Sequence, residues 1–156
     1  MTYVSHLFCS ECGAHFEADQ VNTFCPSCQA PLLVQYDLVV ARQKLDRGEI
    51  SRRPAGMWRW AELLPVRDPA NRLTLGEGDT PLLRLPRLGA ALGLPNLFCK
   101  EEGRNPTGSF KARGLAAAVS KAKELRIQRL IIPTAGNAGG ALAAYAARGG
   151  LQTCVI

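Results

Sequence analysis

The chain beyond residue 80 alternates short apolar runs with longer segments in which apolar residues recur at every third or fourth position. A short apolar run bounded by Gly, Pro or Arg predicts a buried strand, whereas a recurrence of three or four predicts a helix with one buried face. Strands that alternate with helices in this way are typical of a parallel α/β sheet. The predicted strands are 82–85, 97–100, 129–133 and 152–156, and the predicted helices are 88–92, 109–126 and 137–148.

The last predicted strand stops where the sequence stops. A domain seldom ends inside a core strand, because the next helix is needed to cover that face of a parallel sheet. We therefore expect this chain to be the amino-terminal part of a longer protein, and we expect its α/β sheet to be incomplete.

The first eighty residues divide into two parts with different patterns. Residues 1–36 contain three short apolar stretches, which predict a small β-rich unit. Residues 37–50 place apolar side chains on one helical face, whereas residues 51–80 are rich in Arg, Pro and Gly and predict an irregular connection that wraps another surface. We therefore expect three parts: a β-rich unit over 1–36, a connecting segment over 37–80 and an α/β catalytic portion over 81–156.

Two C-x-x-C pairs lie in the β-rich unit, separated by twelve residues. Each pair can present two thiolates from a tight turn, so the two pairs together can hold one tetrahedral metal ion. Unliganded cysteines or two redox pairs explain the pattern less well, because four cysteines at this spacing rarely serve another role. The sequence therefore predicts a zinc ribbon with the ligands Cys9, Cys12, Cys25 and Cys28.

Four thiolates fill every position of a tetrahedral ion, so the predicted zinc is structural rather than catalytic. A unit of this length buries too little apolar surface to fold unaided, and metal binding would supply the missing free energy. Paired cysteines without a secretion signal are expected in a reducing compartment, which predicts a cytoplasmic protein. The nearby His6 and His15 are expected to pack or to face solvent.

Charge is distributed unevenly along the chain. The net charge is +6, yet residues 1–40 contain four acidic residues and neither Lys nor Arg. A nucleic-acid module needs basic residues to neutralise phosphates, so no binding of nucleic acid through the ribbon is expected. No apolar run is long enough to predict a membrane-spanning helix. The basic excess beyond residue 40 suits a phosphorylated ligand, although most of those charges are expected on a solvated surface.

A lysine stands in the first turn of the predicted helix 109–126, within the segment GRNPTGSFKARG. A cation is unfavourable there because the amino-terminal end of a helix carries positive partial charge. Lys111 is therefore either an exposed residue that tolerates this cost or an amine kept neutral so that it can form a Schiff base. For the preceding Glu101, Glu102 and Arg104, an exposed turn is preferred to the alternatives of ordering the loop or contacting a ligand.

A second motif, TAGNAGG at 134–140, follows the predicted strand 129–133 and opens the next helix. Small residues allow backbone N–H groups to approach a ligand, and a helix amino terminus favours an anion. The motif lacks the G-K-[ST] of a P-loop and differs from G-x-G-x-x-G. By itself it predicts either an anion-binding turn or a close helix contact. Tyr145, further along this helix, is expected to pack.

Together, GRNPTGSFKARG, TAGNAGG and the GEGDTPL segment at 76–82 resemble the fold-type II pyridoxal-phosphate (PLP) enzymes, and in particular the threonine synthase family. The resemblance extends over essentially the whole chain and implies a tryptophan synthase β-like parallel sheet. It implies that Lys111 forms a Schiff base with PLP, that Phe110 packs beside the cofactor and that Asn137 contacts its 3′ oxygen. It also implies substrate contacts by Thr80 near the entrance and by Thr134, Ala135, Gly136, Asn137 and Ala138 around the carboxylate.

The resemblance implies a homodimeric enzyme that converts O-phospho-L-homoserine and water to L-threonine and phosphate. Lys111, once released from the cofactor, is the expected acid–base group. The family's phosphate cup and its contact to the pyridine nitrogen are expected downstream of residue 156, so the isolated chain is expected to be inactive. The alternatives are another fold-type II enzyme, such as a serine/threonine dehydratase or a cysteate synthase-like protein, and a non-enzymatic zinc module.

Overall fold

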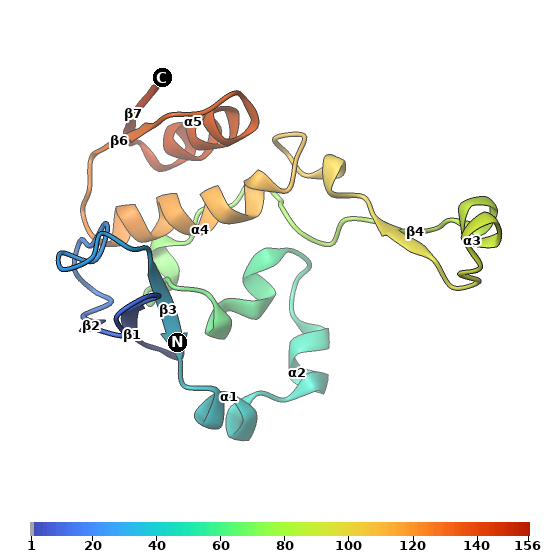
Figure 1. The fold of residues 1–156 in the computed structure, drawn as a ribbon, viewed down its shortest axis with the longest axis horizontal. Coiled ribbons are helices and arrows are strands. Elements are labelled where there is room, and N and C mark those ends of the chain that lie inside the picture. Colours follow the sequence, from blue (N-terminus) through green and yellow to red (C-terminus); the bar gives the residue numbers. More distant parts are fainter. Residues whose placement is uncertain (1) are drawn as a thin grey trace.

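Helix α4 (Lys111–Glu124) crosses the middle of the molecule, and the remaining parts lie around it (Figure 1). The computed structural model describes residues 2–156. A three-stranded unit lies near one end of α4, helix α5 (Asn137–Gly149) lies along its side, and an arm formed by residues 82–100 projects away. None of the helices described over these residues is long and apolar enough to cross a membrane.

The amino-terminal unit is an antiparallel sheet with the strand order β2-β1-β3. Phe8 lies opposite His15 on one side and opposite Leu33 on the other, which fixes the register of the sheet. The unit has a small buried cluster that includes Cys9 and Cys25. The three strands confirm the three predicted apolar stretches and are β1 (Val4–Cys9), β2 (His15–Phe16) and β3 (Leu32–Tyr36).

The segment that follows contains two short helices where the pattern over 37–50 predicts one helical stretch. Helix α1 (Leu38–Lys44) is followed by extended backbone. Helix α2 (Arg47–Arg52) begins anew after Asp46, whose carboxylate accepts a hydrogen bond at 2.7 Å from the backbone N–H three residues later. A capping aspartate satisfies an otherwise unpaired N–H group and so favours a helix start at this point. Two 3-10 turns follow in the irregular connection, η1 (Met57–Leu63) and η2 (Pro69–Asn71).

Helix α5 packs against α4 through small side chains. Ala112 and Ala116 of α4 and Ala141 and Ala146 of α5 are fully buried. Alanine has no atoms beyond Cβ, so two alanine-rich helices can approach closely without losing helix propensity. The core is completed by Met57, Leu73, Val119, Leu142 and Tyr145.

The connecting segment is fastened to this core by hydrogen bonds as well as by apolar contacts. The backbone N–H of Leu73 donates to Oγ of Ser120 on α4 at 2.8 Å, and both residues are buried. The indole N–H of Trp58 donates to the backbone carbonyl of Leu73, also at 2.8 Å. Residues 57–73 therefore lie along the core, as the sequence predicts for a segment that wraps another surface.

The parallel sheet consists of β6 (Arg129–Ile132) and β7 (Gln152–Val155), connected by α5. This strand–helix–strand unit confirms the parallel α/β arrangement predicted for 129–156. The sequence predicts that both strands are buried, but Ile131 is 66% exposed and Val155 is 46% exposed. Helix α5 contacts both strands and still leaves these side chains uncovered, so the prediction of fully buried strands is wrong for this chain.

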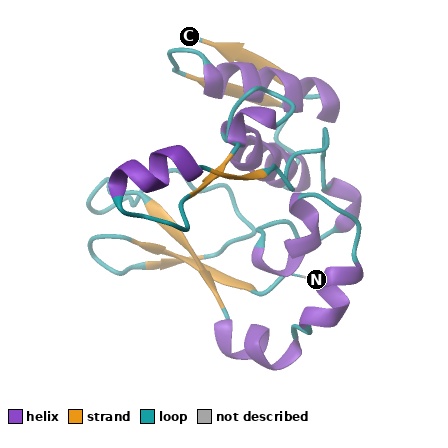
Figure 2. Ribbon diagram, turned by 90° about the vertical axis from the view of Figure 1, so that its right-hand side faces the viewer, coloured by secondary structure: helices purple, strands orange, loops and turns teal. Residues whose placement is uncertain are grey.

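The predicted strand 97–100 lies outside the parallel sheet, contrary to the expectation that it belongs to the series of parallel strands alternating with helices. It forms β5 (Phe98–Lys100), which pairs antiparallel with β4 (Leu82–Arg84) across helix α3 (Pro86–Leu92). Gly93 ends α3 in the left-handed conformation, with φ of 68°, and this reversal returns the chain alongside β4. The arm projects from the body in Figure 1 and points toward the viewer in Figure 2. All residues of its two strands are exposed, so the prediction of burial for 97–100 is wrong too.

Candidate functional site

The four cysteines of the amino-terminal unit meet at one point. Cys9 ends β1, Cys12 lies in the turn after it, and Cys25 and Cys28 lie in a second turn. Their sulfur atoms all lie within 4.8 Å of one another. The sulfurs of Cys9 and Cys28 are 3.4 Å apart, and those of Cys12 and Cys25 are 3.6 Å apart. The fold therefore brings together all four predicted metal ligands.

The spacing of these sulfur atoms fits a tetrahedral zinc site. With Zn–S bonds of about 2.3 Å, the sulfurs of such a site lie about 3.8 Å apart. The backbone N–H groups of Cys12 and Glu11 donate to the Cys9 sulfur at 3.5 and 3.4 Å and lower the pKa of this thiol, whereas the contact with the Cys9 sulfur raises the pKa of Cys28. A thiol that ionises readily suits metal binding, because the thiolate is the ligand. Four convergent thiols can hold zinc without an open position, as in structural sites.

An ion-pair network joins this unit to the carboxyl end of α4. Asp19, between the two cysteine pairs, accepts hydrogen bonds from Arg67 at 2.7 Å and from Lys121 at 2.9 Å. Burial would raise the pKa of Asp19, but the hydrogen bonds and charges of Lys121 and Arg67 lower it below its usual value. Lys121 lies about 15 Å from Lys111 along the helix axis. The metal-binding unit is therefore attached to α4 at the end opposite the lysine motif.

Lys111 is the first residue of α4, and its amine lies 4.4 Å from the centroid of the Phe110 ring, which is 58% exposed. The hydroxyls of Thr107 and Ser109 are buried and have no hydrogen-bond partner among residues 2–156. A buried hydroxyl without a partner costs free energy, which favours the binding of a polar ligand beside it. The amine, the exposed ring and the two unpaired hydroxyls fit an aromatic cofactor with polar substituents, such as PLP.

The loop 134–138 follows β6, includes the first two residues of α5 and is held tightly at the amino end of this helix. Gly136 has φ of 151°, which residues with a side chain rarely adopt, and its N–H donates to the Thr134 hydroxyl at 3.2 Å. A Cβ added to Gly139 would lie 2.7 Å from Cγ2 of Thr134 and 2.6 Å from a methyl group of β7. The absence of a side chain at Gly139 therefore permits the close contact of α5 with Thr134 and with β7, which fixes the loop. Asn137, the first residue of α5, is exposed.

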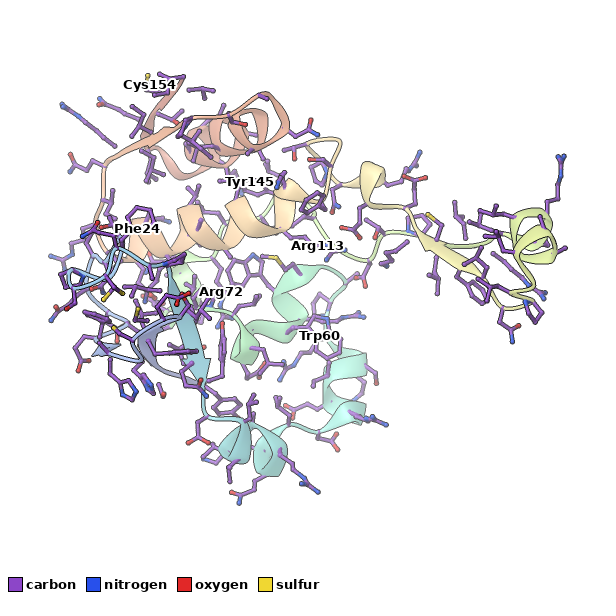
Figure 3. The ribbon with its side chains drawn as sticks, in the orientation of Figure 1. Phe24, Trp60, Arg72, Arg113, Tyr145 and Cys154 are labelled. Atoms are coloured by element: carbon purple, nitrogen blue, oxygen red, sulfur yellow. The ribbon has the colours of Figure 1, made fainter. Side chains whose placement is uncertain are left out.

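Thr80 lies in a polar network at the amino end of α4. Its hydroxyl donates to Oε1 of Glu102 at 2.6 Å. Arg113, two residues after Lys111, donates two hydrogen bonds to the Glu102 carboxylate, at 2.7 and 2.8 Å. Arg113 first, and Thr80 and Asn105 with it, lower the pKa of Glu102 to about 2. Figure 3 shows Arg113 at the end of α4 from which the arm projects.

The sequence favours an exposed turn for Glu102 over a role in ordering the loop. The expected turn is present as η3 (Glu102–Arg104), but the Glu102 side chain is only 26% exposed, so its expected exposure is wrong. The sequence did contain one signal of this contact. Residues two apart on a helix point to different sides, so Arg113 has different surroundings from Lys111. A partly buried arginine needs its own acidic partner, and the acidic pair 101–102 is close in sequence.

The structure thus brings some of the predicted site residues into contact and leaves others apart. Phe110 and Lys111 are in contact, and Thr80 is joined to the lysine helix by a 3.4 Å contact with Arg113. Over residues 2–156, no hydrogen bond or ion pair joins Lys111 directly to the loop 134–138. The loop is connected to α4 through the packing of α5, so the position of α5 determines the geometry between these two parts of the site.

A protein-family model described as pyridoxal-phosphate dependent enzyme (PALP) matches residues 73–156. The matched range begins just after η2 and contains the GEGDTPL segment, the Lys111 segment and the TAGNAGG loop. It covers more than half of the chain. The chain belongs to the pyridoxal-phosphate dependent enzyme family.

Three individual proteins to which the chain is similar are threonine synthases. The chain is 40% identical to the threonine synthase of Methanosarcina acetivorans over 152 residues, which are 97% of this chain and 36% of that protein. It is 38% identical to the threonine synthase of Methanocaldococcus jannaschii over 148 residues, which are 95% of this chain and 36% of that protein. The threonine synthase of Halalkalibacterium halodurans is 47% identical over 97 residues, 62% of this chain and 27% of that protein. The chain therefore spans 36% of the length of the first two relatives.

We predict that the four thiols bind one zinc ion per chain. Replacing the fully buried Cys25 by serine should weaken zinc binding by more than the roughly 10–100-fold that loss of an outer-shell partner costs, because a ligand itself is lost. Competition with a chromogenic chelator measures the affinity. Cys99→Ser, at an exposed cysteine outside the unit, is the control and should bind zinc as the unmodified chain does. Tight stoichiometric zinc in Cys25→Ser would contradict the assignment.

Glu102 should also give folding stability a specific pH dependence. Its pKa is lowered in the folded state from the ordinary 4.5 to about 2, so its contribution is present above pH 4.5 and is lost as pH falls toward 2. We predict that Glu102→Gln is less stable than the unmodified chain at neutral pH and that the difference narrows between pH 4.5 and 2. Urea unfolding at several pH values measures this, with the exposed Glu17→Gln as control. A difference that stays constant with pH would refute the prediction.

Proposed function

We propose that the full-length protein is a threonine synthase, which converts O-phospho-L-homoserine and water to L-threonine and inorganic phosphate. The observation that carries this proposal is similarity to a threonine synthase over 97% of the chain, a span that includes the four-thiol unit as well as the Lys111 segment. Family membership supports the cofactor, and the named relatives support the particular reaction.

Lys111 is the residue to which we assign the binding of the cofactor and the transfer of protons. Bound PLP supplies an electron sink for negative charge that develops on the substrate carbons. Lys111 is the first residue of α4 and offers its amine at the amino end of this helix. Phe110 offers an apolar surface beside that amine, and the unpaired hydroxyls of Thr107 and Ser109 offer hydrogen-bond partners for polar groups of the cofactor.

The reaction requires a base and an acid at neighbouring carbon atoms. The bond between the γ carbon and the phosphate oxygen breaks, the phosphate leaves with the bonding electrons, and water adds its hydroxyl at the β carbon. Substrate and water contain all the atoms of threonine and phosphate, and no net oxidation occurs. The proton at the α carbon is removed and later returned, the β carbon loses a proton and the γ carbon gains one, and we assign these transfers to the amine of Lys111.

The loop 134–138 binds the substrate carboxylate in this proposal. Helix α5 has thirteen residues, and the N–H groups at its amino end carry the positive partial charge that a carboxylate needs. The Thr134 hydroxyl and the backbone of Ala135, Gly136 and Ala138 would contact the carboxylate, and the exposed side chain of Asn137 would hold the 3′ oxygen of the cofactor. Thr80, held by Glu102, lies near the substrate entrance.

The remaining parts of the chain support this site in the proposed protein. Zinc in the four-thiol unit is structural, with residues 1–36 as a ribbon, 37–80 as a connection and 81–156 as the first part of the catalytic domain. The protein is a cytoplasmic homodimer, because its family resemblance implies a dimer and its reduced thiols suit a reducing compartment. It binds no nucleic acid, since residues 1–40 carry acidic residues and no Lys or Arg.

We predict that the purified full-length protein, loaded with PLP, releases phosphate from O-phospho-L-homoserine and forms threonine in equal amount. Lys111→Ala should lower this rate at least about 10³-fold, because both cofactor attachment and proton transfer are lost. Lys123→Ala, on the same helix but bonded to the carbonyl of Ala70, should retain the rate. A phosphate-release assay coupled to amino-acid analysis measures both products.

Parallel assays with other substrates separate this proposal from related enzymes. Phosphate release from O-phospho-L-serine alone would indicate a synthase for a different phosphorylated amino acid. Deamination of serine or threonine alone would indicate a dehydratase. Either result would overturn the threonine synthase assignment and leave the family assignment intact.

A further inference from the structure

A buried hydrogen bond joins α5 to the GEGDTPL segment at 76–82. Tyr145 donates its hydroxyl proton to Oε2 of Glu77 at 2.6 Å, and both side chains are fully buried. The same oxygen accepts hydrogen bonds from the Leu75 N–H at 3.0 Å and from the Thr74 hydroxyl at 3.2 Å. Figure 3 shows Tyr145 in the layer between α5 and α4.

A fully buried carboxyl group is costly unless its partners compensate for the loss of water. None of the ion pairs within residues 2–156 includes Glu77, and its second oxygen, Oε1, is buried without a hydrogen-bond partner there. The three donors on Oε2 therefore provide the compensation. Burial, together with Glu77, raises the pKa of Tyr145, so the tyrosine hydroxyl stays protonated and remains a donor.

The backbone around Glu77 is itself fixed to the body of the protein. The Glu77 carbonyl accepts a hydrogen bond from the Met57 N–H at 2.9 Å, and the Gly78 N–H donates to Oδ1 of the buried Asn105 at 3.2 Å. A Cβ added to Gly78 would lie 2.6 Å from the backbone nitrogen of Met57, so the two backbones are in close contact. Glu77 is therefore a fixed point to which α5 is attached.

The contacts of α5 with α4 itself are apolar, and they bury Ala112 and Ala116 of α4 together with Leu142 of α5. Apolar burial is not directional, so it allows small shifts of one helix along the other. A hydrogen bond confines its two atoms to within a few tenths of an ångström. Tyr145 lies about 12 Å from Asn137 along the helix axis, so this bond sets both the rotation of α5 and the position of its amino end.

We propose that Glu77 and Tyr145 are positioning residues: their buried hydrogen bond fixes α5 so that the loop 134–138 keeps its place relative to Lys111. Neither residue contacts substrate, and both act through the helix. The part of this proposal that concerns substrate affinity rests on the proposed function, whereas the part that concerns the loop itself does not.

Tyr145→Phe tests the proposal because it removes one oxygen and keeps the packed ring. In the full-length protein, we expect KM for O-phospho-L-homoserine to rise about tenfold while kcat changes less than about twofold. We also expect amide hydrogen exchange of the loop 134–138 to become about tenfold faster. Glu77→Gln retains an oxygen acceptor, whereas Glu77→Ala does not. KM and loop exchange should therefore change less in Glu77→Gln than in Glu77→Ala.

Ser120→Ala is the matched control, since it removes a buried hydrogen bond of α4 with Leu73 and leaves α5 and Glu77 unchanged. It should lower the midpoint of unfolding and leave KM and loop exchange at their original values. If Tyr145→Phe behaves in the same way, the bond is merely stabilising and the proposal is overturned. If the unmodified protein releases no phosphate from O-phospho-L-homoserine, the proposed function fails, and the exchange of the loop alone then decides the positioning role.

Discussion

The close packing of α4 against α5 is the contact on which the candidate site depends. Fully buried alanines such as Ala112 and Ala141 allow the two helices to approach each other closely. The Lys111 segment at the start of α4 and the loop 134–138 at the start of α5 are therefore held in one packed unit. Small apolar side chains specify that the helices meet, but they do not specify a unique register. The buried hydrogen bond of Tyr145 with Glu77, which we propose as the positioning contact of α5, supplies that register.

Helix α4 is also held at both ends by ion pairs, which differ in geometry and in exposure to solvent. At the amino end, Arg113 makes a two-point contact with Glu102, a geometry that restricts orientation as well as distance. At the carboxyl end, Lys121 shares the half-exposed Asp19 with Arg67, and such pairs contribute at most about 1 kcal/mol each. The metal-binding unit is thereby attached to the helix. The buried cluster of this unit is small, and its four metal-binding thiols take the place of a larger core.

Sequence patterns predicted those features that are determined locally. The cysteine spacing predicted the thiol cluster, and the recurrence of apolar residues predicted α4, α5 and the strands on either side of α5. The pairing of residues 97–100 was not predictable in this way, because an apolar run indicates a strand without indicating its partner. The bond between Glu77 and Tyr145 joins residues 68 positions apart, and no periodicity in one sequence records such a contact. The roles of Lys111 and of the loop 134–138 stay predictions.

The assignment of Lys111 as the cofactor lysine is tested most directly by locating the covalent adduct. The full-length protein would be loaded with PLP, reduced with borohydride, digested and mapped by mass spectrometry. The account predicts a reduced phosphopyridoxyl group on Lys111. An adduct confined to another lysine, such as Lys100, whose amine donates to the Thr80 carbonyl, or Lys121, which is paired with Asp19, would contradict it, as would the absence of any adduct.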